Sequence, residues 1–162
     1  MTKVKCDMSM SVDGFVAGPN QSADKPFGEG VDDRLHRWMF EQADVNAAEI
    51  EAITSAGAYV MGRNMFGPGR GDWDLDWQGW WGDDPPYHAP VFVLTRHPRE
   101  PLTMQGGTTF TFVTDGIESA LVAPVMLGAG ERLLDGVGNF DLEPLGATSN
   151  ELVTHLSYRV IR

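Results

Sequence analysis

Two short apolar runs, residues 58–61 and 91–94, show no alternation of polar and apolar side chains. Such a run suits a strand that is covered on both faces, as in a parallel sheet. Residues 109–113 read as a third strand. With helical segments ahead of these strands and short connectors between them, we predict an α/β fold with a mixed, mostly parallel central sheet flanked by helices.

Other elements follow from local patterns. Residues 3–12 alternate, which predicts a half-buried strand with Val4, Cys6, Met8, Met10 and Val12 on its inner face. Asp32 or Asp33 can cap a helix whose apolar stripe is Leu35, Trp38 and Met39. A second helix is expected over residues 43–55, burying Val45, Ala48 and Ile53 and ending at Gly57.

The tail, residues 152–161, reads as an antiparallel or edge strand with Leu152, Leu156, Tyr158 and Val160 inward. Residues 122–127 read as another strand. Only residues 115–121 connect it to the strand that ends near Thr114, and a parallel crossover needs a dozen or more. Either the chain lacks a segment near Leu121 and Val122, or residues are omitted from the sequence there, which we favour.

Composition narrows the classes of protein and of partner. With 162 residues and 42% hydrophobic content, we expect one compact domain over residues 1–162. No apolar stretch is long enough to span a membrane and no signal peptide is evident, so we expect a cytoplasmic protein. The net charge of −11 argues against nucleic acid or an anionic membrane as partner. A phosphate site would then be local, and Arg63, Arg70, Arg96 and Arg99 lie within or just after the two apolar runs.

Arginines where neighbouring strands end can hold a phosphate bidentately. Taken alone, Gly62-Arg63 and Leu94-Thr95-Arg96 each fit an ordinary turn with a solvated cation equally well. Likewise, Asp13-Gly14 can be simple turn chemistry after a strand, and the Gly128 turn can be a structural bend.

Four motifs in order resemble those of the dihydrofolate-reductase-like family: residues 11–18, 61–66, 94–96 and 123–134. Within it the chain is similar to the C-terminal reductase domain of the bacterial riboflavin-biosynthesis deaminase-reductase. The resemblance implies NADPH as cofactor, bound by Ala17, Gly18, Gly62, Arg63, Asn64, Met65, Leu94, Thr95, Arg96 and Gly128. In that family Arg63 and Arg96 would select NADP over NAD through its 2′-phosphate.

Hydride transfer also needs a proton source, and Asp13, in the loop that the family places beside the nicotinamide, is the first candidate. Asp32 and Asp33 are better explained as helix caps. No histidine pair has metal-ligand spacing, so we predict no metal, although His88 and His97 are expected near the site.

Four of the five tryptophans fall in residues 72–88, a segment without periodicity. It would either pack against a second subunit or form the wall of a pocket for a flat heterocycle. The family resemblance implies a homodimer and transfer of hydride from NADPH to a small molecule, a pteridine- or pyrimidine-type heterocycle. The alternatives are a non-catalytic NADP-binding module and a protein that sequesters a small ligand.

Overall fold

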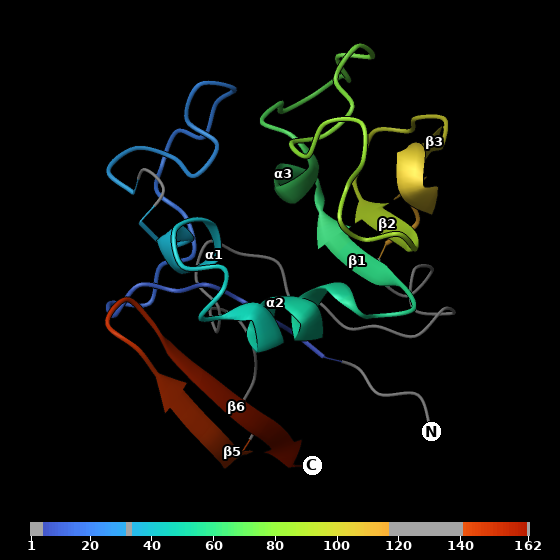
Figure 1. The fold of residues 1–162 in the computed structure, drawn as a ribbon. Helices are drawn as coiled ribbons and strands as arrows, with labels where there is room; N and C mark the ends of the chain where they lie inside the picture. The colour runs from blue at the N-terminus through green and yellow to red at the C-terminus, as the bar shows by residue number, and fades with distance from the viewer. Residues whose placement is uncertain (1–4, 32–33, 117–140, 162) are drawn as a thin grey trace.

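A computed structural model describes residues 5–31, 34–116 and 141–161. Its central sheet has the order β1-β2-β4-β3, formed by β1 (Tyr59–Gly62), β2 (Pro90–Leu94), β4 (Thr109–Val113) and β3 (Leu102–Thr103). β1 pairs with β2 and β2 with β4 in parallel, whereas the short β3 runs antiparallel to β4. The prediction of a mixed, mostly parallel sheet is confirmed (Figure 1).

One face of this sheet is fully buried. Met61, Val91, Val93, Phe110 and Phe112 share that face by the strand register and are 0–9% exposed. The opposite face, which carries Val60, Phe92 and Leu94, is only half-buried. The prediction that both faces are covered therefore overestimated the burial of the second face. The sequence of β2 does not alternate between polar and apolar residues, but the burial of its side chains does.

The cover of the buried face is largely aromatic. The single-turn helix α3 (Arg63–Phe66) follows β1 directly and places Phe66, which is fully buried, against Phe110 and Phe112. Three tryptophans of the 72–88 loop pack on the same cluster together with Tyr87: Trp73, Trp77 and Trp81. The loop thus completes the core of its own chain, an explanation that the sequence patterns did not suggest. Among the described helices, α3 makes the most extensive contact with the sheet.

The helices ahead of the sheet are shorter than predicted. Helix α1 spans Arg37–Phe40 and buries Trp38, while Asp32 and Asp33 lie outside the described residues. Helix α2 spans Ala47–Thr54 and ends before Gly57, as expected. The predicted burial of Val45 and Ala48 is wrong, because both are exposed. Asn46, the residue after Val45, is buried instead.

The predicted N-terminal strand is wrong: residues 5–12 form no strand, and Cys6, Met8, Met10 and Val12 are exposed. Alternation shows which side chains could share a face, but a strand also needs a partner for its backbone. The start of this segment instead lies beside helix α2, because Lys5 Nζ donates a hydrogen bond to the carbonyl oxygen of Ala52 at 3.3 Å.

A separate hairpin ends the described chain. β5 (Asp141–Ser149) pairs antiparallel with β6 (Thr154–Ile161), which confirms an antiparallel strand in the tail. The inward placement of its apolar side chains is wrong, because the following are 42–58% exposed: Leu152, Leu156, Tyr158 and Val160. The predicted strand over 122–127, the junction near Leu121 and Val122, and Gly128 all lie outside the described residues.

Candidate cofactor site at the ends of the parallel strands

The carboxyl ends of three parallel strands meet at one edge of the sheet. Gly62 of β1 is in register with Leu94 of β2, which is in turn in register with Val113 of β4. Arg63 and Thr95 are the first residues after these two strands. This edge is where ligands bind in open α/β sheets. The structure therefore brings together seven of the predicted site residues: Gly62, Arg63, Asn64, Met65, Leu94, Thr95 and Arg96.

The two arginines at this edge differ in what they contact. Arg63 Nε donates to the carbonyl oxygen of Gly69 at 2.8 Å and Nη2 to that of Asp72 at 3.3 Å. Its guanidinium carbon lies 3.7 Å from the centroid of the Trp73 ring. The remaining nitrogen, Nη1, is buried and has no hydrogen-bond partner among the described residues. Arg63 thus holds the loop that follows α3.

Arg96 is exposed, and no described residue accepts a hydrogen bond from its guanidinium. The backbone around it is well fixed. Thr95 donates its N–H to the carbonyl oxygen of Val113 at 3.1 Å, and Thr95 Oγ1 accepts the N–H of His97 at 3.1 Å. Arg96 therefore presents a free guanidinium from a fixed strand end.

Arg99 is a third guanidinium nearby. It donates to the carbonyl oxygens of Asp74, Leu75 and Trp77 at 2.7–3.4 Å. Burial lowers the pKa of Arg99 from its ordinary value. The negative charge of Asp74 opposes this shift, and the positive charge of Arg63 lowers the pKa further. Burial likewise lowers the pKa of Arg63, with Asp72 opposing and Arg70 adding. Arg63 and Arg99 therefore lie close enough to influence each other, with Asp72 and Asp74 beside them.

Asp13, Ala17 and Gly18 lie in a different part of the molecule, in the N-terminal loops beside α1 (blue in Figure 1). Asp13 Oδ1 accepts a hydrogen bond from Ser11 Oγ at 2.6 Å in a tight turn. Gly18 donates its N–H to the carbonyl oxygen of Phe27 at 2.8 Å. These hydrogen bonds lie within the N-terminal loops and do not join Asp13 or Gly18 to the strand ends.

The two histidines expected near the site are at opposite ends of the sheet. His97 follows Arg96, and its Nδ1 lies 3.5 Å from an oxygen of Asp72. His88 precedes β2, and its N–H is donated to Thr108 Oγ1 at 3.0 Å. The placement of His97 is confirmed and that of His88 is wrong. Among the described residues, no group of three His, Cys, Asp or Glu side chains could hold a metal ion.

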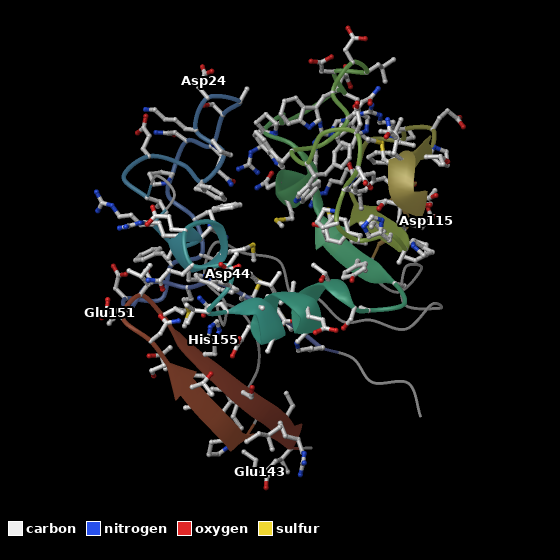
Figure 2. All side chains as sticks on the ribbon, in the orientation of Figure 1. Asp24, Asp44, Asp115, Glu143, Glu151 and His155 are labelled. Atoms are coloured by element: carbon white, nitrogen blue, oxygen red, sulfur yellow. The ribbon has the colours of Figure 1, made fainter. Side chains whose placement is uncertain are left out.

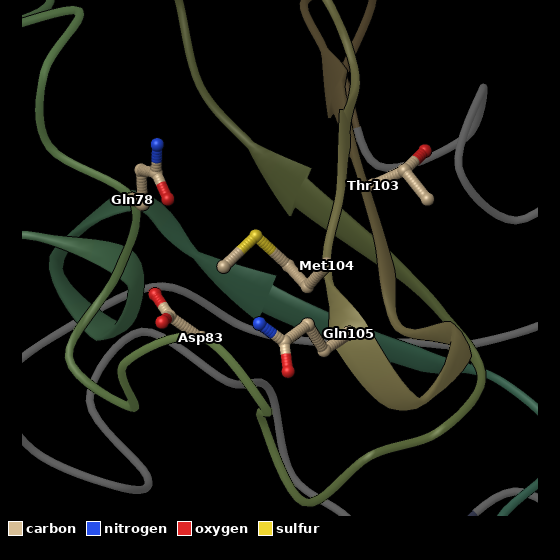
Figure 3. A pocket seen from close by; sticks show the side chains of 5 residues that line it. All are labelled: Gln78, Asp83, Thr103, Met104 and Gln105. Atoms are coloured by element: carbon tan, nitrogen blue, oxygen red, sulfur yellow. The ribbon is translucent and has the colours of Figure 1, made fainter.

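A small open pocket of about 210 Å³ lies at the other end of the sheet, lined by Gln78, Asp83, Thr103, Met104 and Gln105 (Figure 3). Thr103 pairs with Thr109, the first residue of β4, and Thr109 is in register with Pro90, the first of β2. The pocket therefore borders the amino ends of the strands. It is not part of the arginine site.

Sequence reasoning missed the role of Trp73, and it named Arg99 only as one of four nearby arginines. Trp73 contacts Arg63 and donates its indole N–H to the carbonyl oxygen of His97 at 2.8 Å. Arg99 supports the tryptophan loop. The position of Arg99 soon after the second strand indicated that it could lie near the site. Its contacts could not be predicted, because its acceptors are backbone carbonyls more than twenty residues away in the sequence.

The fold and the strand-end site can be compared with known families. The family model described as the RibD C-terminal domain matches residues 2–123. The chain belongs to the RibD C-terminal domain family. Membership implies a reductase-type domain related to riboflavin biosynthesis, in a family that generally binds NADP. A search of the curated proteins finds no significant match. Within the described residues, no helix is long and apolar enough to cross a membrane.

Proposed function

We propose that this RibD C-terminal-type domain is an NADPH-dependent reductase that transfers hydride to a pteridine- or pyrimidine-type heterocycle. The observation that carries the proposal is the exposed guanidinium of Arg96 at the carboxyl end of β2, beside the start of α3. Family membership supports the reductase class.

The residues at this edge fit a phosphorylated dinucleotide. Arg96 can bind the 2′-phosphate bidentately, which is the chemical difference between NADP and NAD. The unpaired Nη1 of Arg63 is a buried charged donor without an acceptor, an arrangement that costs free energy unless an acceptor arrives. Thr95 and the backbone of residues 62–65 supply further polar groups, as the family resemblance implies.

NADPH, when bound, supplies the hydride, so the chain needs only to hold two rings together and deliver a proton. Asp13 is the proposed proton source, and its bond from Ser11 fixes its carboxylate. Ala17, Gly18 and Gly128 are proposed to line the nicotinamide side of the site. Of these, Gly18 already has a structural reason to be glycine, because a Cβ there would collide with the carbonyl oxygen of Glu29.

The test of cofactor choice is calorimetric titration of NADPH and NADH into the wild-type chain and Arg96→Ala. We expect the wild type to prefer NADPH, and Arg96→Ala to lose about 1–3 kcal/mol of NADPH affinity, the scale of a charge-assisted hydrogen bond. Arg159→Ala is the matched control, since Arg159 is exposed on the hairpin and, among the described residues, pairs with Glu143 alone (Glu143 is labelled in Figure 2). Equal affinity of the wild type for both cofactors would overturn the proposal.

The non-catalytic alternative predicts the same binding but no reaction. A reductase should oxidise NADPH faster when pteridine or pyrimidine heterocycles are added, and Asp13→Asn should slow this step with little effect on NADPH affinity. Oxidation at an unchanged rate across such a set would favour a binding module that has lost its chemistry.

We also propose that the chain forms a homodimer. The hairpin leaves Leu156, Tyr158 and Val160 exposed along one strand, which is unusual for a surface that contacts only water. Sedimentation velocity gives the mass directly, and a monomer at micromolar concentration would contradict this proposal without affecting the one for NADPH.

A further inference from the structure

One side chain, Trp73, joins the loops that follow β1 and β2. Arg63, the first residue after β1, stacks its guanidinium on the Trp73 ring at 3.7 Å. The indole N–H is donated to the carbonyl oxygen of His97 at 2.8 Å, and His97 is the residue after Arg96. Trp73 therefore connects the two strand ends that carry the candidate phosphate site.

The orientation of the indole is fixed from the core side. Its ring packs edge-on against Phe66 at 5.7 Å and Phe112 at 5.0 Å between centroids. Phe66 is fully buried and Phe112 nearly so. Because the ring is held by the core, its N–H points to a defined place, and the carbonyl oxygen of His97 is fixed with it.

The consequence falls on Arg96. The residue before it is fixed by the bond from Thr95 N–H to the carbonyl oxygen of Val113, and the residue after it by Trp73. The backbone is therefore held on both sides of an exposed guanidinium. A cation presented in this way loses less conformational entropy when it binds an anion than one on a mobile loop.

We infer that Trp73 is a positioning residue for cofactor selectivity: its indole N–H holds residues 95–97 in the conformation from which Arg96 reaches the 2′-phosphate of NADPH. The inference rests on the proposed function. Trp73 need not touch the cofactor, so its effect should appear in the preference for NADPH over NADH.

The test is Trp73→Phe, which keeps an aromatic ring against Phe66 and Phe112 and under Arg63 but lacks the N–H donor. In calorimetric titrations we expect NADPH affinity to fall about fivefold, the equivalent of one hydrogen bond, while NADH affinity changes less than about twofold. Hydrogen exchange of residues 95–97 should become faster. Trp73→Tyr is a second variant, whose hydroxyl stands at the tip of the ring and not where the indole N–H stands, and the same result is expected.

Trp77→Phe is the matched control, because it also loses an indole N–H bond, the one donated to the carbonyl oxygen of Phe66 at 2.9 Å, in the same loop. It should keep the wild-type preference. In the double variant Trp73→Phe/Arg96→Ala, the loss should be no larger than in Arg96→Ala alone, since Trp73 acts through Arg96.

The outcomes separate this inference from the proposed function. A wild-type preference for NADPH that Arg96→Ala abolishes and both Trp73 variants retain would overturn the positioning role and leave the proposed function standing. An equal loss of NADPH and NADH affinity in the Trp73 variants would also overturn it, since that indicates general loss of structure. A wild type without any preference would overturn the proposed function itself.

Discussion

The carboxamide oxygen of Asn46 lies 3.1 Å from Nε2 of His155, more than one hundred residues further along the chain. Asn46 is 2% exposed and also donates to the carbonyl oxygens of Trp38 and Gln42 at 3.2 and 2.8 Å. Because its amide nitrogen is the donor in those bonds, its oxygen is an acceptor and His155 Nε2 carries a proton. One buried amide therefore ties the C-terminal hairpin to the segment between α1 and α2.

Replacing this amide should destabilise the chain. Asn46→Ala removes the partner of two carbonyls, of His155 and of Asn150 Nδ2, and leaves buried groups unpaired. We expect a loss of about 2–4 kcal/mol in the free energy of unfolding, several times the net value of one hydrogen bond. Urea unfolding measures it. Gln105→Ala is the control, since the Gln105 side chain is exposed and makes no hydrogen bond to a described residue; equal losses in the two variants would contradict the prediction.

The loop glycine at position 18 gives a second prediction. A Cβ at Gly18 would collide with the carbonyl oxygen of Glu29 and contact Val31, so Gly18→Ala should lower the melting temperature whether or not cofactor is present. Gly57→Ala has nothing within 4 Å of the added atom and should change it little. If Gly18→Ala instead kept the wild-type melting temperature and lost only NADPH binding, the prediction would be wrong. The cofactor-binding role that the family resemblance implies would then explain the glycine better.

The sequence predicts the parallel strands well because each is a self-contained apolar run. Their carboxyl ends must then meet, which explains why the predicted residues on β1 and β2 come together. The contacts between residues far apart in the sequence could not be predicted from it. The packing of Trp73 on Phe66, and the loop carbonyls that Arg63 and Arg99 hold, depend on residues without any periodicity.

Patterns without a partner were misleading for a related reason. The alternation of residues 3–12 is real, but no strand pairs with the described part of that segment. The hairpin strand β5 was missed because Pro144 and Gly146 interrupt it and its register shifts between them. Proline and glycine weaken a strand signal even where a bulge accommodates them.

Arg63 should contribute to stability, unlike Arg96. Arg63→Ala removes the stacking on Trp73 and two hydrogen bonds to loop carbonyls. We expect a loss of about 1–2 kcal/mol in the free energy of unfolding, while Arg96→Ala stays within about 0.5 kcal/mol of the wild type. Thermal and urea unfolding of both variants measure this difference. A larger loss for Arg96→Ala would contradict the contacts described for the two side chains.

Arg99 should order the tryptophan loop. Arg99→Met keeps much of the aliphatic stem but gives up the hydrogen bonds to the carbonyls of Asp74, Leu75 and Trp77. Faster hydrogen exchange and faster proteolysis are therefore expected within residues 72–82. Arg159→Met, which loses only an exposed ion pair with Glu143, should leave that loop unchanged. Equal protection of the loop in both variants would show that the aromatic packing holds it without Arg99.

His36 gives a prediction for pH. Its ring stacks on Phe27 at 4.3 Å between centroids, its Nδ1 is buried without a partner, and burial lowers the pKa of His36 below the ordinary value of 6.5. Below pH 6.5 the unfolded chain therefore binds a proton at His36 that the folded chain resists. The contribution of neutral His36 to the free energy of unfolding is thus present above pH 6.5 and is lost as the pH falls from 6.5 toward the lowered pKa.

His36→Phe keeps a ring against Phe27 and cannot titrate. Urea unfolding at pH 7.5 and pH 5.5 should show a smaller acid-induced loss of stability in His36→Phe than in the wild type, and identical losses would mean that the folded chain protonates His36 as readily as the unfolded one.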